Sequence, residues 1–284
     1  MLTSTDMHGY YGLGDLKEIL RVLKENGFEA YDFSMFKGLS HEILLADDYI
    51  ERAKDLRAYA DSIGLPCNQA HAPHATAKKG NEEYNEKMRP LIKRAIEISG
   101  ILGAKICVVH PCNDYTAEEN AEMYRDFEPT ARRAGVKIGV ENMWNYADKV
   151  LKTFAAAACS HHDDFKRHLD LLPADVFVAC LDVGHCSLEG MGTDPAQMVD
   201  TLGDRLQAIH LHDVDFKSDS HAIPFAQKID FEPFIEALRR NDYRGDITLE
   251  STYMVAHHPV ELLPATARYA AEIAAYFKRR VLAE

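Results

Sequence analysis

The chain has 284 residues, enough for one large α/β barrel of about 250 residues or for two ordinary domains. Its hydrophobic share of 46% and charged share of 27% are typical of a soluble globular protein. The formal net charge of −13 argues against nucleic acid or an anionic membrane as a partner, because phosphate binding needs a positive surface. No stretch approaches the roughly 18 apolar residues of a membrane span, and the first residues do not resemble a signal peptide. We therefore expect a cytoplasmic protein.

The cysteines are predicted to be reduced thiols. They show no CxxC spacing and several lie in apolar, strand-like runs, which is the usage expected in a reducing compartment rather than in a disulfide or zinc framework. They are Cys67, Cys107, Cys112, Cys159, Cys180 and Cys186.

Short apolar runs alternate with amphipathic helices along the whole chain. After a first strand in the opening residues, the apolar residues of segment 15–26 fall on one helical face, and Gly27 follows as a stop signal. Further helices are predicted at 48–63, 83–102, 117–134, 165–172, 195–203, 231–241 and 260–280. Further strands are predicted at 29–35, 67–74, 104–111, 136–142, 175–185, 206–215 and 245–252.

This alternation makes eight strand–helix units and predicts a parallel sheet with right-handed crossovers. The strands are apolar on both faces, as strands buried on both sides should be. Eight units that close on themselves form a (β/α)8 TIM barrel, and no linker divides residues 1–284, so we expect one barrel domain. An open doubly wound sheet is less favoured, because no GxGxxG motif follows the first strand.

Six successive predicted strands end in imidazole or carboxylate side chains. In a (β/α)8 barrel the carboxyl ends of the strands meet at one mouth, where the active sites of such barrels lie. The residues at these ends are His71, His110, Glu141, Asp182 with His185, His210 with His212, and Glu250. Asp219 and His221, in the loop after the seventh strand, can reach the same mouth.

Carboxylates crowded in this way would repel one another, and a divalent cation removes that repulsion. The mixed His, Asp and Glu set suits zinc, manganese, cobalt or iron better than calcium. One histidine at a strand end is most often structural, so the metal hypothesis rests on the repetition. Six other histidines are expected on the surface or in loops: His74, His161, His162, His168, His257 and His258.

The segments VVHP, GVEN, LDVGH, HLHD, DSH and TLE, which span most of the chain, resemble motifs of the xylose isomerase-like barrel superfamily. That group includes sugar isomerases and epimerases, hydroxypyruvate isomerase, inosose dehydratases and endonuclease IV. Resemblance to the ketose 3-epimerases implies that one divalent ion, Mn²⁺, Co²⁺ or Zn²⁺, is bound by four residues. These are Glu141, Asp182, His210 and Glu250, and His185 matches a position that contacts substrate.

The resemblance implies a metal-dependent isomerase or epimerase acting on a small sugar. A proton next to a carbonyl would be removed through a metal-bound enediolate, with Glu141 and Glu250 as the two proton-transferring carboxylates. The loop after the eighth strand has no Lys or Arg, and the preceding loop has only Lys217 and Lys228, which favours a non-phosphorylated sugar. Trp144 either stacks on the sugar or anchors its loop, and Phe225 is a weaker candidate of the same kind.

Two alternatives remain open. In the endonuclease IV branch, two further zinc ions are bound at positions that match His71, His110, His185, Asp219 and His221. Up to three ions and a phosphodiesterase activity are therefore compatible with the sequence. A lyase or dehydratase of the same barrel would begin with the same proton removal, and the sequence does not separate it from an isomerase. His212 is expected to contact substrate or a metal ligand. Barrels of this kind commonly pair, so a homo-oligomer is compatible with the resemblance.

Overall fold

Eight parallel strands form the barrel in the computed structural model, which describes residues 1–283. They are β1 (Thr3–Thr5), β2 (Tyr31–Ser34), β3 (Cys67–His71), β4 (Ile106–Val109), β5 (Lys137–Glu141), β8 (Phe177–Asp182), β9 (Leu206–His210) and β10 (Ile247–Leu249). Six of them pair in the order β2-β3-β4-β5-β8-β9, and β1 pairs with β10. Parallel bridges between Asp6 and Asp32 and between Leu211 and Leu249 close the ring. The predicted (β/α)8 architecture is therefore confirmed.

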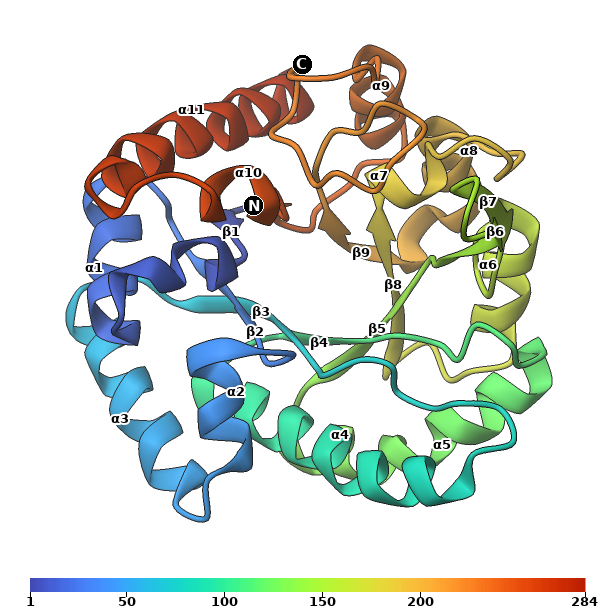
Figure 1. The fold of residues 1–284 in the computed structure, drawn as a ribbon, viewed down its shortest axis with the longest axis horizontal. Helices are drawn as coiled ribbons and strands as arrows, with labels where there is room; N and C mark the ends of the chain where they lie inside the picture. The colour runs from blue at the N-terminus through green and yellow to red at the C-terminus, as the bar shows by residue number, and fades with distance from the viewer. Residues whose placement is uncertain (284) are drawn as a thin grey trace.

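Eight helices surround the strands as an outer ring (Figure 1). They are α1 (Leu16–Glu25), α3 (Tyr49–Ser62), α4 (Glu82–Leu102), α5 (Ala117–Ala134), α6 (His162–Asp170), α8 (Pro195–Leu202), α9 (Glu232–Arg240) and α11 (Leu263–Leu282). Each begins and ends within a few residues of the predicted bounds, because the sequence carries explicit end signals. In α5, Thr116 and Glu119 form a reciprocal capping box, and Gly135 ends the helix in the left-handed conformation.

Several short elements were not predicted, and most of them lie at the mouth. They are η1 (Met7–Leu13), α2 (Gly38–Leu45), the antiparallel hairpin β6 (Trp144–Asp148) and β7 (Thr153–Ala156), η2 (Gly203–Arg205) and α10 (Thr252–Ala256). The predicted strand 175–185 is too long, because its last residues form the short helix α7 (Val183–Cys186), and the start of the predicted helix 260–280 is the separate turn η3 (Val260–Leu262). Figure 1 shows α2, α7 and α10 inside the outer ring of helices, and each of them follows the carboxyl end of a barrel strand. These segments therefore shape the entrance to the barrel.

The apolar core fills the space between strands and helices and includes fully buried Phe33, Phe177 and Phe277. A smaller apolar cluster, Ile106, Val108, Val178, Cys180 and Ala208, lies separately from it. All six cysteines are buried with free thiols, as predicted. Within residues 1–283, no helix combines the length and the apolarity needed to cross a bilayer.

Candidate metal centre

Four side chains from four barrel strands converge at the mouth. Glu141 ends β5, Asp182 ends β8, His210 ends β9, and Glu250 follows β10. One ligand atom from each lies within 4.8 Å of the others, and all four residues are buried. Parallel pairing brings Asp182 level with His210 across the sheet. The four residues predicted to bind one divalent ion are thus brought together around one point.

The electrostatics of this cluster suit a cation. Nδ1 of His210 lies 2.8 Å from Oε1 of Glu141 and 3.4 Å from Oε2 of Glu250. Among the described residues, every ion pair of Glu141, Asp182 and Glu250 is with a histidine. Burial raises the pKa of Glu250 to about 8 despite the nearby His210 and His221. Three buried carboxylates without a Lys or Arg, together with one imidazole, fit a divalent ion of the zinc, manganese or cobalt kind.

Asn142, which was not singled out in the sequence, fixes Asp182. Its Nδ2 donates to the Asp182 carbonyl at 2.9 Å, and its Oδ1 accepts the Asp182 N–H at 2.7 Å. The Asp182 carboxylate also accepts the backbone N–H of His185 at 2.7 Å, which caps α7. Burial alone would raise the pKa of Asp182, but His185 and His212 lower it to about 2. The only sequence signal for Asn142 was its place directly after Glu141 in the GVEN segment.

A second cluster, His185, His212, Asp219 and His221, adjoins the first. Oδ2 of Asp219 lies 3.3 Å from Nε2 of His221 and 3.5 Å from Nε2 of His185. Burial alone would lower the pKa of His221, but Asp219 and Glu250 raise it to about 10. The predicted candidates in the loop after β9 therefore do reach the mouth.

His212 links the two clusters. Its Nε2 lies 3.0 and 3.1 Å from the two carboxylate oxygens of Asp182, and its ring stacks on His221 with centroids 4.1 Å apart. Gly184 leaves the space for this imidazole, because a Cβ there would lie 2.0 Å from His212 Cε1. The expectation that His212 contacts a metal ligand or substrate agrees with this contact to Asp182.

His71 and His110 share the second oxygen of Glu141. Their Nε2 atoms lie 3.3 and 2.8 Å from Oε2 of Glu141 and 3.0 Å from each other. His71 donates its Nδ1–H to the carbonyl of Ala72 at 2.7 Å, which turns its Nε2 toward Glu141 and His110. His71, Glu141 and His210 make a further group with ligand atoms within 4.8 Å.

A cavity of about 460 Å³ opens onto these residues. Trp144 lines it, donates to Oδ2 of Asp219 at 3.2 Å, and packs edge-on against Tyr146 and Phe154 of the hairpin. Both roles considered for Trp144, stacking on a sugar and anchoring its loop, are compatible with this position. Phe225 is not among the lining residues and packs instead on Phe277, stacked with centroids 5.3 Å apart.

His74 and His168 were both expected at the surface or in a loop. His74 is an exposed loop residue, as expected, and it also lines the cavity and stacks on His110 with centroids 5.2 Å apart. The expectation for His168 is wrong, because this residue is buried in α6 and its Nε2 lies 3.3 Å from Nδ2 of Asn120. Lys37, His8 and Tyr253 also line the cavity; they could not be predicted, because segments that were not predicted carry them to the mouth.

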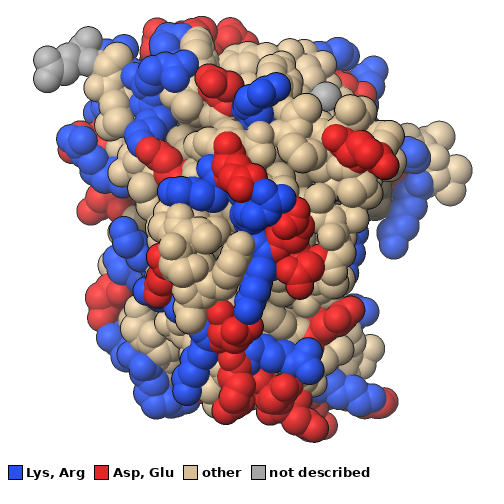
Figure 2. Space-filling model, turned by 90° about the vertical axis from the view of Figure 1, so that its left-hand side faces the viewer, with Lys and Arg blue, Asp and Glu red and all other residues tan. Residues whose placement is uncertain are grey.

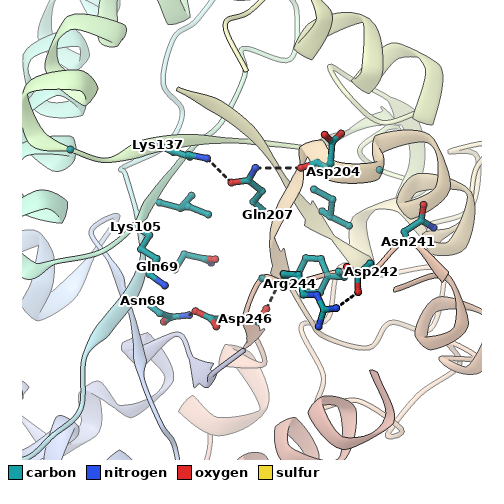
Figure 3. Close-up of a pocket in the computed structure, with 16 residues that line it drawn as sticks. Asn68, Gln69, Lys105, Lys137, Asp204, Gln207, Asn241, Asp242, Arg244 and Asp246 are labelled. Carbon is teal, nitrogen blue, oxygen red and sulfur yellow. Dashed lines mark hydrogen bonds and ion pairs between the residues drawn. The ribbon is translucent and has the colours of Figure 1, made fainter. Parts of the chain in front are cut away.

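A larger cavity, about 750 Å³, lies at the opposite end of the barrel, where β4, β5, β9 and β10 begin (Figure 3). Lys137 and Gln207 face each other across it, with Nζ and Oε1 2.9 Å apart. None of the candidate site residues lines this cavity. The volume of a cavity therefore does not identify the reactive end of the barrel.

A family model, the xylose isomerase-like TIM barrel, matches residues 15–279. The chain belongs to the xylose isomerase-like TIM barrel family. Members of such a barrel family place their variable chemistry at the mouth described above, so membership fixes the fold and leaves the reaction to the site residues.

Solved structures share the fold over nearly the whole chain. A D-tagatose 3-epimerase-like protein is 20% identical with a TM-score of 0.76, covering 99% of this chain and 98% of that one. D-psicose 3-epimerase, solved in the presence of D-fructose, is 14% identical with a TM-score of 0.73, covering 100% of both chains. The IolI protein, solved with a zinc atom, is 17% identical with a TM-score of 0.73, covering 99% and 98%.

Two curated sequence relatives are more similar in sequence. The y4fM protein of Sinorhizobium fredii is 24% identical over 83% of this chain and 81% of its own length. The L-ribulose 3-epimerase of Methylomonas sp. is 25% identical over 79% of this chain and 74% of its own length.

Proposed function

We propose that this protein is a divalent-metal-dependent sugar epimerase or isomerase that moves a proton next to a carbonyl. The observation that carries the proposal is the buried group of Glu141, Asp182, His210 and Glu250. Its three carboxylates have only histidines as ionic partners within the part of the chain that the structure describes. The same four residues are those implied by resemblance to the ketose 3-epimerases. An ion bound there would polarise a substrate carbonyl and stabilise the negative charge left when the neighbouring proton is removed.

Glu141 and Glu250 are the residues proposed to move that proton. Glu141 and Glu250 come from β5 and from the end of β10, and Nδ1 of His210 lies between their carboxylates. One carboxylate can accept the proton at one face of the sugar while the other returns a proton at the opposite face, which inverts the carbon. Return of the proton to the neighbouring carbon instead would give isomerisation.

The mouth favours a neutral sugar. Lys37 is the only Lys or Arg among the described residues that line the cavity, and its side chain is exposed. A phosphate group is usually held by several donors in a basic or glycine-rich loop. Trp144 and Phe36 add aromatic surface against which the apolar face of a sugar can pack.

The names of several relatives support the same reaction class. They are a D-tagatose 3-epimerase-like protein, D-psicose 3-epimerase and L-ribulose 3-epimerase, and the structure of IolI contains zinc. The test is product formation. The full chain, stripped with a chelator and reloaded separately with Mn²⁺, Co²⁺ or Zn²⁺, is incubated with ketopentoses and ketohexoses, and the sugars are separated by chromatography.

A C3 epimer or an aldose that forms only in the reloaded protein supports the proposal. Equal product in the stripped and the reloaded protein would contradict metal dependence. A dehydrated or cleaved product would instead assign the chain to the lyases of the same barrel, because these begin with the same proton removal.

A multi-zinc phosphodiesterase of the endonuclease IV kind is the second candidate. Two groups of side chains beside the four proposed ligands favour it. In one, His71 and His110 contact Glu141. In the other, Asp219 contacts His185 and His221. The net charge of −13 counts against a DNA partner. On the face shown in Figure 2, acidic and basic side chains intermingle rather than form one basic surface. About three zinc ions per chain by elemental analysis, with cleavage of abasic DNA, would favour this candidate.

A further inference from the structure

A buried carboxylate with no role so far lies deeper in the barrel than the four proposed ligands. Asp32, in the middle of β2, is fully buried. Its Oδ2 accepts a hydrogen bond from Nε2 of Gln69 at 2.9 Å and lies 3.7 Å from Nε2 of His210. Its Oδ1 has no hydrogen-bond partner among the described residues. A buried carboxylate that is only half satisfied is destabilising, so its presence in a strand that is buried throughout needs a reason.

The histidines around the site suggest that reason. His71, His185 and His221 each donate Nδ1–H to a backbone carbonyl, at 2.7, 2.9 and 2.9 Å. In each of them the proton is thereby fixed on Nδ1, and Nε2 faces the carboxylates. A neutral imidazole can bind an ion through one nitrogen only while its proton sits on the other nitrogen, which needs an acceptor.

His210 is turned the other way. Its Nδ1 faces Glu141 and Glu250, so Nδ1 is the nitrogen available to an ion. Its Nε2 has no hydrogen-bond partner among the described residues, and no backbone carbonyl accepts from it. The carboxylate that faces Nε2 is that of Asp32, at 3.7 Å, and a movement of a fraction of an ångström brings the two atoms within hydrogen-bond distance.

We propose that Asp32 is a positioning residue that accepts the Nε2–H of His210 and thereby holds Nδ1 ready for the ion. Gln69 in turn donates a hydrogen bond to the Asp32 carboxylate, so Gln69 orients Asp32 and Asp32 orients His210. Gln69 also lines the cavity at the amino-terminal end of the barrel, where Figure 3 shows it. The inference rests on the metal site proposed above.

Two neighbours provide matched controls. Asp6 is buried beside Asp32 and is joined to it by the bridge that closes the barrel. Its Oδ1 accepts from the N–H of His8 at 2.8 Å, and its Oδ2, like Oδ1 of Asp32, has no hydrogen-bond partner among the described residues. Of these two carboxylates, the one that lies 3.7 Å from Nε2 of His210 is that of Asp32. The thiol of Cys180 is buried close to His210, but sulfur is only a weak acceptor. Asp6→Asn removes a buried charge next to Asp32, and Cys180→Ala removes a thiol close to His210.

The direct test is the position of the His210 proton in the zinc-loaded full chain. With ¹⁵N-labelled histidine, NMR should show a proton on Nε2 of His210, shifted downfield by a hydrogen bond and absent in His210→Gln. Asp32→Asn should shift that signal upfield and weaken Zn²⁺ binding about 10–100-fold in competition with a chelator, the usual effect of losing an outer partner of a metal ligand. Asp6→Asn and Cys180→Ala should retain the wild-type affinity.

A proton on Nδ1 of His210 in the loaded wild type would overturn the inference, and this measurement requires no variant to fold. Wild-type affinity in Asp32→Asn would also overturn it, as would an equal loss in Asp6→Asn. The two affinity results would leave the metal site itself standing, whereas a proton on Nδ1 would also remove His210 from its ligands. If the wild-type chain binds no Zn²⁺, Mn²⁺ or Co²⁺, the metal site fails and the role of Asp32 fails with it.

Discussion

Adding one methyl group at Gly184 should displace a residue that holds Asp182. The new Cβ would lie 2.0 Å from Cε1 and 2.5 Å from Nε2 of His212. Carbon atoms in contact are about 3.5–4.0 Å apart, so the imidazole must move by about 1.5–2 Å. His212 is fully buried between Asp182 and His221 and has no free space to enter without breaking those contacts. Overpacking of this kind destabilises by about 1–3 kcal/mol.

Gly184→Ala should therefore lower the Tm by about 2–12 °C, because 1 kcal/mol corresponds to about 2–4 °C in chains of 150–250 residues. It should also weaken metal binding at least about tenfold, because His212 would no longer hold the proposed ligand Asp182. Calorimetry and chelator competition measure the two effects. Gly12→Ala is the matched control, because its Cβ would meet only Val260 and Leu263 at 3.4 and 3.5 Å. A wild-type Tm and metal affinity in Gly184→Ala would refute the role given to His212.

Three further outcomes follow from the site. Glu250→Gln should reduce turnover at least about 100-fold while the far-UV circular dichroism spectrum stays unchanged, because a proton-transferring carboxylate is lost. The matched control, Glu261→Gln at an exposed position, should keep full activity. Full activity in Glu250→Gln would remove Glu250 from the mechanism. Asp182→Asn should weaken metal binding by more than the roughly 10–100-fold expected when a residue that hydrogen-bonds a metal ligand is lost. An unchanged metal-binding titration would contradict the assignment of Asp182 as a ligand. Trp144→Phe should lower the free energy of unfolding in urea by about 0.5–1.5 kcal/mol, because the 3.2 Å hydrogen bond from the indole N–H to Asp219 is lost. An unchanged free energy of unfolding would mean that this hydrogen bond does not anchor the hairpin.

The barrel could be predicted because each unit carries its own periodicity and end signals. In α1, Asp15 accepts from the N–H of Glu18 at the start, and Gly27 lies just beyond the end, so the predicted bounds differ from the observed ones by one residue. The unpredicted α2 has apolar residues all round and only eight residues, so no periodicity marks it. The hairpin of β6 and β7 is two-stranded and largely half-buried or exposed, and such strands carry little alternation.

The site could be predicted as far as the strand ends allow. Parallel strands bring their carboxyl ends to one mouth, so the order of Glu141, Asp182 and His210 in the chain was sufficient to place them together. Contacts within the mouth depend on rotamers and on strand stagger, which one sequence does not contain. Asp32 lies in the middle of a strand rather than at its end, and Asn142 acts through its side-chain amide, so neither follows the pattern used to find the ligands.

Proton exchange tests the central claim most directly. The full chain, reloaded with the divalent ion it binds, is incubated with a panel of ketopentoses and ketohexoses in D2O; the ion is removed, and NMR measures deuterium at carbons one and three. The account predicts deuterium next to the carbonyl only when the ion is present, at carbon three for an epimerase or at carbon one for an aldose–ketose isomerase. Exchange that persists in the stripped protein, or no exchange in any sugar with the ion bound, would contradict it.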